Sequence, residues 1–274
     1  MFKRKDHPST VFPKFIVLRM LEADVAPCLL SIYKRAGSKG SLMAGPTDYD
    51  TIASRYAAGV DDRPFNALYE RPATLALLPD VGGRDILDAG CGPGWYTNWL
   101  AQNGARVVAI DCSSHMVRLA EERLRGRARV MRGDVSNLRN LLLSETFDII
   151  LSSLVLHYLP DLTETFREWA RLLRPDGTLV FSTHHPIHQA SLLDPGYLYT
   201  ELIEEEWDWL AEKMRYYRRP LRALTEPLTG AGFVIERINE PTPSEALKMT
   251  DPKSYDLLCR LPAFIFVRAR KLMK

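Results

Sequence analysis

Three glycines lie directly after a short apolar segment in the first half of the chain. Ile86 and Leu87 have strand character, Asp88 follows them, and the glycines occupy positions 90, 92 and 94. The amphipathic segment 97–103 comes next, so the order predicts a strand, a tight turn and a helix. Glycine permits backbone angles that a β-carbon forbids and lets a ligand approach the main chain closely. The stretch therefore predicts a ligand-binding turn.

The spacing of these glycines separates two classes of ligand. It is G-x-G-x-G, whereas the loop that clamps a dinucleotide pyrophosphate has the pattern G-x-G-x-x-G. Trp95 and Tyr96 also stand where that fingerprint needs a small residue for close helix packing. A nicotinamide dinucleotide is therefore disfavoured, and a plain glycine-rich turn between a strand and a helix is the structural alternative.

The residues from 87 to 94, Leu-Asp-Ala-Gly-Cys-Gly-Pro-Gly, resemble without a gap the first motif of class I S-adenosylmethionine-dependent methyltransferases. This resemblance implies S-adenosylmethionine as the cofactor. The residues of the turn that would wrap it closely are Gly90, Cys91, Gly92 and Gly94. The cofactor carries a sulfonium cation and no phosphate, so the Asp88 carboxylate is placed to favour its positive end.

An upstream segment carries a second part of the resemblance. Residues 48–56 resemble the Y-D-x-I-A-x-x-Y segment that precedes the first motif in many small-molecule methyltransferases. In such relatives this helix folds over the cofactor as part of a lid, which would put Tyr49 and Tyr56 near the ligand. The alternative is an ordinary amphipathic helix with Ile52 and Tyr56 facing the core.

The second predicted strand ends in an acid. Segment 106–111 is a β-branched run that finishes at Asp111. A carboxylate at the tip of this strand, about 20 residues past the glycines, is placed to accept both ribose hydroxyls of a nucleoside. Cys112 follows in the same motif and begins the cap of a predicted helix. The resemblance implies that Met116 of this helix packs against adenine, although core packing explains a helical methionine equally well.

The third and fourth strands extend this pattern. Segment 129–135 is the third strand, and the resemblance implies that Asp134 accepts the adenine amine while the Val135 amide meets the ring. Segment 147–153 is an apolar fourth strand, buried in a parallel sheet. Ligands in such sheets lie beyond the carboxyl ends of the strands, so Ser152 and Ser153 should border the transferred methyl group.

Histidines follow the fourth and fifth strands. His157 lies in a segment that resembles the post-strand region of the family, and a structural hydrogen bond is favoured over a role as a base. His184 and His185 follow strand five, 178–182, and either could orient or deprotonate the substrate nucleophile, because histidine titrates near neutral pH. Pro186 keeps His185 out of a helical conformation and no carboxylate is adjacent, so no metal site is predicted.

The order of elements predicts an α/β fold, a Rossmann-like, doubly wound sheet of seven strands. The resemblance covers about residues 48–270 and implies the strand order 3-2-1-4-5-7-6, with strand 7, 264–270, antiparallel. We expect an N-terminal extension and linker over 1–45, with a short helix near 14–23, and one domain over 46–274. An insertion over about 186–220 is rich in aromatic and charged residues and is predicted to cover the substrate, with a surface excursion as the alternative.

Composition narrows the class of protein. The 274 residues carry a net charge of +2, so a global basic field typical of nucleic-acid binders is absent. The four cysteines show no C-x-x-C spacing, which favours a reducing compartment. No apolar run approaches the roughly 18 residues of a membrane span, and Pro27 and charged residues interrupt the apolar part of the N-terminus that superficially suggests a signal. We expect a cytoplasmic monomer or homodimer.

These predictions converge on an enzyme that transfers a methyl group from S-adenosylmethionine to an oxygen, nitrogen or carbon atom of a small-molecule acceptor. One alternative is a cofactor-binding module that regulates or scaffolds without methyl transfer. Another is an RNA methyltransferase, which would want a dedicated basic domain or an Asn-Pro-Pro-Tyr-type motif after strand four. This chain has Ser152-Ser153-Leu154-Val155 there, and no nucleic-acid partner is expected.

Overall fold

The computed structural model describes residues 46–188 and 196–273. The predicted N-terminal extension with its helix lies outside the described residues, as do positions 189–195 of the predicted insertion. No helix among the described residues is long and apolar enough to cross a membrane.

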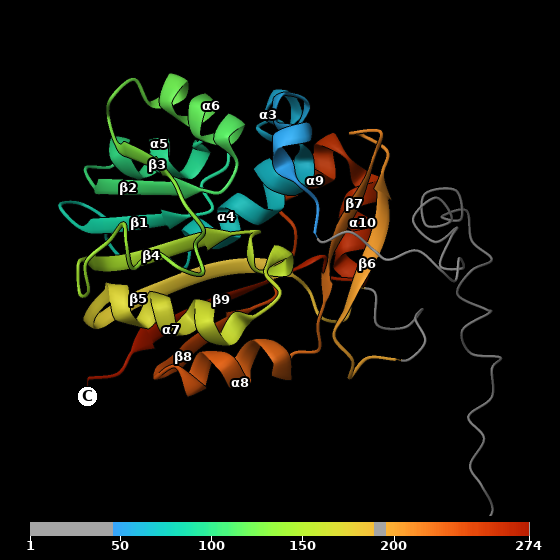
Figure 1. Cartoon of the computed structure of the whole chain (residues 1–274). Coiled ribbons are helices and arrows are strands. Elements are labelled where there is room, and N and C mark those ends of the chain that lie inside the picture. Colours follow the sequence, from blue (N-terminus) through green and yellow to red (C-terminus); the bar gives the residue numbers. More distant parts are fainter. Residues whose placement is uncertain (1–45, 189–195, 274) are drawn as a thin grey trace, which may run out of the picture. The chain divides into compact units, whose positions relative to one another are not determined.

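Seven strands form one mixed sheet in the order β3-β2-β1-β4-β5-β9-β8 (Figure 1). The strands are β1 Asp85–Ala89, β2 Arg106–Asp111, β3 Arg129–Arg132, β4 Phe147–Ser153, β5 Leu173–His184, β8 Phe233–Asn239 and β9 Phe264–Lys271. β1 to β5 pair in parallel, and β9 runs antiparallel to both β5 and β8. The predicted fold class and strand order are confirmed, because β8 and β9 are the sixth and seventh strands of this sheet.

Helices cover both faces of the sheet (Figure 1). One face packs against α7 and α8 through a core that includes Phe166, Trp169 and Leu224. The other packs against a second core that includes Tyr69, Leu100 and Leu258. The helical segments are η1 Tyr49–Thr51, α3 Ala53–Val60, η2 Phe65–Glu70, α4 Arg71–Leu75, α5 Trp95–Gln102, α6 Ser114–Leu124, η3 Leu156–Tyr158, α7 Leu162–Leu172, α8 Arg222–Gly230, α9 Glu245–Thr250 and α10 Pro252–Arg260.

The insertion after β5 contains a hairpin that the sequence analysis did not predict. β6, Glu201–Trp207, pairs with β7, Glu212–Arg218, in a separate two-stranded antiparallel sheet. Alternate side chains of β7 are buried, as expected where one face of a strand packs against the protein. Met214 and Tyr216 on that face pack with Ile52 from the segment before α3. The predicted lid segment and the insertion therefore form one packed unit.

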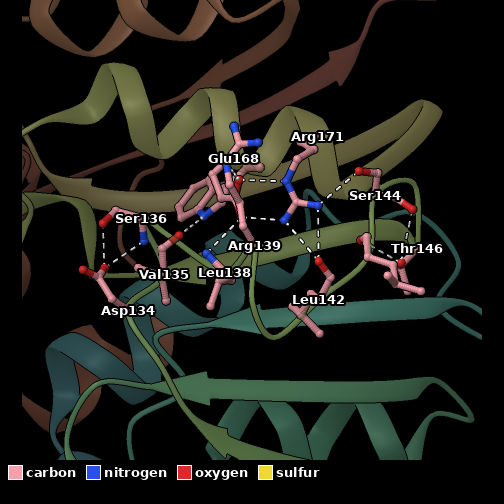
Figure 2. A network of polar contacts seen from close by, with 12 residues as sticks. Asp134, Val135, Ser136, Leu138, Arg139, Leu142, Ser144, Thr146, Glu168 and Arg171 are labelled. Atoms are coloured by element: carbon pink, nitrogen blue, oxygen red, sulfur yellow. Dashed lines mark hydrogen bonds and ion pairs between the residues drawn. The ribbon is translucent and has the colours of Figure 1, made fainter.

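The loop after β3, which carries Asp134 and Val135, is fixed by α7 (Figure 2). Trp169 donates its ring N–H to the Val135 carbonyl at 2.9 Å. The buried Glu168 carboxylate accepts the Leu138 amide at 2.9 Å and pairs with the Arg171 guanidinium at 2.6 Å. Two residues on one turn of α7 therefore hold the loop in place.

We predict that Glu168→Ala lowers the free energy of unfolding by about 3 kcal/mol, because it leaves a guanidinium and a buried amide without their partner. Urea unfolding followed by circular dichroism measures the loss. The control is Arg167→Ala on the same helix, whose ion pair with Glu164 is more than half exposed and should contribute nothing measurable. Equal midpoints for the two variants would show that the network does not anchor the loop.

Candidate active site

A cleft that is partly open to solvent lies beyond the carboxyl ends of β1 and β4. Its walls come from the glycine turn, from the end of β4 and from η2 and α4, which precede β1 in the sequence. Residues at this cleft that the sequence analysis assigned to the cofactor are Tyr56, Asp88, Gly90, Cys91 and Gly92. The structure therefore brings the lid segment and the first motif to one cavity.

The glycine turn has no room for a side chain at its first position. Gly90 has a φ of +84°, and a β-carbon there would lie 2.2 Å from a Val155 methyl group. The amides of Gly90 and Cys91 both donate to the Ile110 carbonyl, at 2.8 and 3.0 Å. These contacts hold the turn against β2 and against the segment that follows β4. Gly94 has a φ of +82° and lies before α5, outside the cleft wall.

Asp88 is a buried acid, with 1% of its surface exposed. Its Oδ2 accepts the Thr97 hydroxyl at 2.5 Å. Burial raises the pKa of Asp88 to about 7, the Thr97 hydrogen bond opposes that shift, and the neighbouring charge of Asp111 adds to it. A cation placed in the cleft would favour the ionised form of this carboxyl.

Asp111 lies at the end of β2, beside the turn. Its two oxygens accept the Gly92 and Ser113 amides, each at 2.9 Å. The carboxylate therefore ties the glycine turn to the start of α6, while burial raises its pKa. Each oxygen has a second lone pair, so these amide bonds are compatible with the predicted contact to ribose hydroxyls, which stays a prediction.

The residues predicted for the adenine end do not form part of the cleft wall. Met116 is buried at the start of α6, and Val135 is buried with its carbonyl bonded to Trp169. The Asp134 Oδ1 accepts the amide and hydroxyl of Ser136. Cys112 is exposed, next to Asp111. These positions follow the adjacent strands β2 and β3, and their roles toward adenine stay predictions.

The expectation for Ser152 requires a correction. Its side chain is fully buried and donates to the Ala89 carbonyl at 2.8 Å, so it binds β4 to β1. Ser153 lines the cleft instead. Successive side chains of a strand point to opposite faces, so only one of the two serines can reach the cavity.

The segment before α3 is hydrogen-bonded to the start of α6 and to η3. Asp50 of η1 accepts the Ser113 hydroxyl at 2.5 Å and the His115 amide at 3.2 Å, and the Ser113 bond is the main reason that the pKa of Asp50 falls to about 2. The Tyr49 and Tyr158 hydroxyls are 2.7 Å apart. Tyr56 borders the cleft while Ile52 is buried, so both predicted orientations occur in one segment.

Sequence reasoning missed Glu70, the most connected acid in the site. Glu70 is 1% exposed, ends the π-helix η2 and lines the cleft; such π segments are frequent at functional sites. Its carboxylate accepts four hydroxyls, at 2.6 to 2.8 Å, from Ser182, Tyr96, Thr74 and Ser153. The only signal in the sequence was a pair of opposite charges, Glu70-Arg71, before the apolar run that leads to β1.

Arg71 is the second charged residue that the sequence analysis did not assign to the site. It is buried, pairs with Asp61 at 3.2 Å, and lies 4.2 Å from the centre of the Trp95 ring. Arg71 and Glu70 are adjacent in the chain and line the same cleft. The cavity therefore offers one buried group of each charge beside the turn.

Two of the predicted catalytic histidines stack on each other. The His157 and His184 rings have centroids 3.9 Å apart and planes at 12°. His157 Nδ1 lies 3.3 Å from the Thr183 hydroxyl. Burial lowers the pKa of His184 to about 3 and puts that of His157 well below its usual value. Both rings are uncharged at neutral pH.

The third histidine has both ring nitrogens engaged. His185 Nε2 lies 2.7 Å from a Glu240 oxygen, and its Nδ1 accepts the Ile187 amide at 3.1 Å. In contrast, His184 Nδ1 is shielded from solvent and has no hydrogen-bond partner within residues 46–188 and 196–273. Of the three histidines predicted to be catalytic, His184 is therefore the one with a lone ring nitrogen to offer a substrate among the described residues.

Comparisons with known proteins agree with this geometry. The sequence model of a family described as a methyltransferase domain matches residues 87–181. The crystal structure of an S-adenosylmethionine-dependent methyltransferase from Mesorhizobium loti is 33% identical, with a TM-score of 0.64, and the match covers 78% of this chain and 100% of that one. The chain belongs to the S-adenosylmethionine-dependent methyltransferases, so it is an enzyme of this class with S-adenosylmethionine as its cofactor.

Two curated relatives are similar over a shorter stretch. Malonyl-[acyl-carrier protein] O-methyltransferase of Enterobacter lignolyticus is 34% identical over 50% of this chain and 55% of its own length. Ubiquinone biosynthesis O-methyltransferase of Xanthomonas oryzae is 37% identical over 49% of this chain and 58% of its own length. The matches thus span little more than half of each relative.

We predict that Asp88 makes the stability of the protein depend on pH. Because its pKa rises from 3.8 to about 7 on folding, the stabilisation is complete below about pH 4 and is lost as the pH rises through about 7. Chemical denaturation across this range should therefore show a steeper fall in the free energy of unfolding for the native chain than for Asp88→Asn. Parallel curves would contradict the raised pKa.

Proposed function

We propose that this enzyme methylates an oxygen atom of a small-molecule acceptor held between the cleft and the hairpin β6–β7. The observation that carries the proposal is the position of His184 at the end of β5 beneath that hairpin, with a ring nitrogen that has no partner among the described residues. The two curated relatives are both named as O-methyltransferases, which supports oxygen as the nucleophile.

The charged residues of the cleft suit the cofactor. A buried acid and a buried arginine side by side fit the ammonium and carboxylate of an amino-acid tail, and we assign Glu70 and Arg71 to it. Asp88 would favour the positive charge of the sulfonium, and Asp111 would accept the ribose hydroxyls. Asp134, Val135, Met116 and Cys112 would border adenine.

The bound cofactor supplies an electrophilic methyl group, so the protein mainly has to align the acceptor and exclude water. An aromatic wall serves both purposes. Tyr56, at the cleft, contacts Trp209 with ring centroids 5.7 Å apart, and Trp209 stacks on Trp207 at 6.2 Å. Trp207 in turn lies 6.4 Å from the His184 ring. The wall leads from the cofactor cleft to the histidines.

His184 would accept a hydrogen bond from the acceptor hydroxyl and take its proton as the methyl group is transferred. Because the pKa of His184 is lowered to about 3, its ring is neutral at physiological pH and carries a single N–H. When that hydrogen lies on Nε2, Nδ1 is a free acceptor, and burial shields Nδ1 from water. His157 stacks beneath it and fixes the plane of the ring. His185 would position the turn after β5 through Glu240.

The proposal is tested by incubating the full chain with methyl-labelled S-adenosylmethionine and a cell extract freed of large molecules. A labelled small-molecule product is expected. His184→Ala should lower its rate of formation by about a hundredfold with little change in cofactor affinity, measured by calorimetry.

The matched control is His185→Ala, which lacks a free ring nitrogen in the native chain and should lose thermal stability more than turnover. Label found only in protein or RNA, when the whole extract is used, would contradict a small-molecule acceptor. Full activity of His184→Ala would remove the histidine from the reaction.

A further inference from the structure

A second cavity, small and partly open to solvent, lies under the hairpin at the end of β5. It is lined by the histidines and by the end of β7, and it shares no residue with the cleft that we assign to the cofactor. Its polar walls include His184, His188, Arg218 and Arg219, and its apolar walls include Tyr216 and Leu224.

Three buried nitrogen atoms in this wall have no hydrogen-bond partner among the described residues: His184 Nδ1, His188 Nδ1 and Arg218 Nη1. Buried polar atoms are nearly always paired, and each unpaired one costs free energy. Three such atoms around one cavity form a site at which water or a polar ligand completes their hydrogen bonds.

Arg218 Nη1 is the best oriented of the three unpaired atoms. Its residue is 5% exposed, and its Nε and Nη2 donate to one Glu201 oxygen at 3.1 and 2.8 Å. Nη2 also donates to the Gly196 carbonyl at 3.0 Å. Two of the three guanidinium nitrogens are thus anchored to the hairpin, which aims the third, Nη1, without using it.

Arg219 adds a second positive charge, which the nearby Asp161 partly offsets. It is 7% exposed and donates only to backbone carbonyls, of Leu156, Leu159 and Pro160. No carboxylate among the described residues lies within ion-pair distance of it. Burial lowers the pKa of Arg219 to about 10, so it stays charged at neutral pH. Glu201 pairs with Arg218, Asp161 acts on Arg219 and Glu205 acts on His188, so an anion would be held by the aimed Nη1 of Arg218 and not by an excess of positive charge.

We propose that this cavity binds a carboxylate group of the methyl acceptor, with Arg218 Nη1 and the His188 ring N–H donating to its oxygens. The identification of the ligand as the methyl acceptor rests on the proposed function, but the anion site itself does not. His184 remains free to face the hydroxyl that is methylated. Tyr216 and Leu224 favour an apolar body next to the carboxylate, so the acceptor is a small hydroxylated acid with an apolar or aromatic skeleton.

Benzoate and benzamide test the charge requirement, because they share a skeleton and differ in the anionic group. Titrated into the full chain without cofactor, at constant ionic strength and followed by tryptophan fluorescence, benzoate should bind at least tenfold more tightly than benzamide. Arg218→Gln should abolish this preference. Equal binding of the two compounds by the native chain would overturn the proposal.

Glu201→Gln is the matched control, because it breaks the same ion pair and keeps Arg218. If Arg218 only braces the hairpin, Glu201→Gln and Arg218→Gln should lose benzoate binding equally, and that result would overturn the proposal. If Arg218 holds the anion, Glu201→Gln should bind benzoate as tightly as the native chain or more tightly. Melting temperatures of both variants report whether the hairpin stays folded.

Cofactor affinity, measured on the same samples with S-adenosylhomocysteine, separates this inference from the proposed function. Benzoate binding that depends on Arg218 supports the anion site even if no labelled product forms with cell extract. Normal cofactor binding and methyl transfer without any preference for benzoate would leave the proposed function standing and remove the carboxylate from the acceptor.

Discussion

The architecture of the site depends on one buried carboxylate. Glu70 accepts hydroxyl groups from α4, α5, β4 and β5, and these elements are distant in the sequence. A buried ionised group is tolerated only when it is hydrogen-bonded, so the four hydroxyls and the acid require one another. The consequence is that η2 is held against the carboxyl ends of the central strands, and Arg71 is carried into the cleft with it. Of the four hydroxyls, only that of Tyr96 donates to Oε2, which keeps a lone pair for a ligand.

The hairpin β6–β7 is positioned by a different kind of contact. Apolar packing joins Met214 and Tyr216 to Ile52, and the Arg215 carbonyl accepts the Thr47 amide at 3.1 Å. The segment before the sheet and the insertion after β5 therefore pack against each other. Tyr216 and the stacked histidines line the cavity under the hairpin, where buried polar groups interact more strongly than in water.

The features that could be predicted from the sequence were those encoded locally. The glycine turn, the acids near the ends of β1 and β2 and the order of the strands all follow from short patterns of residue type, and the fold class was confirmed. Ser152 and Ser153 were both placed at the methyl group, because a strand pattern gives alternation but not its phase, and only Ser153 lines the cleft. Glu70 was missed because its burial depends on hydroxyls from four separate segments, none of which marks it in the sequence.

The hairpin and the histidines show a related limit. β6 and β7 are rich in charged residues, so their alternation becomes apparent only when the buried face of β7 is known. His184 and His185 are neighbours of the same type, and no local pattern distinguishes them. They differ because Glu240, from the segment after β8, hydrogen-bonds to His185, whereas His184 Nδ1 has no partner among the described residues.

The most direct test of the charged cleft compares S-adenosylhomocysteine with 5′-methylthioadenosine, which keeps the nucleoside and thioether but lacks the amino-acid tail. If Glu70 and Arg71 bind that tail, calorimetry should give a dissociation constant at least about a hundredfold lower for S-adenosylhomocysteine, the value of two charge-assisted contacts. Equal constants for the two compounds would contradict the assignment of the buried acid and arginine to the cofactor.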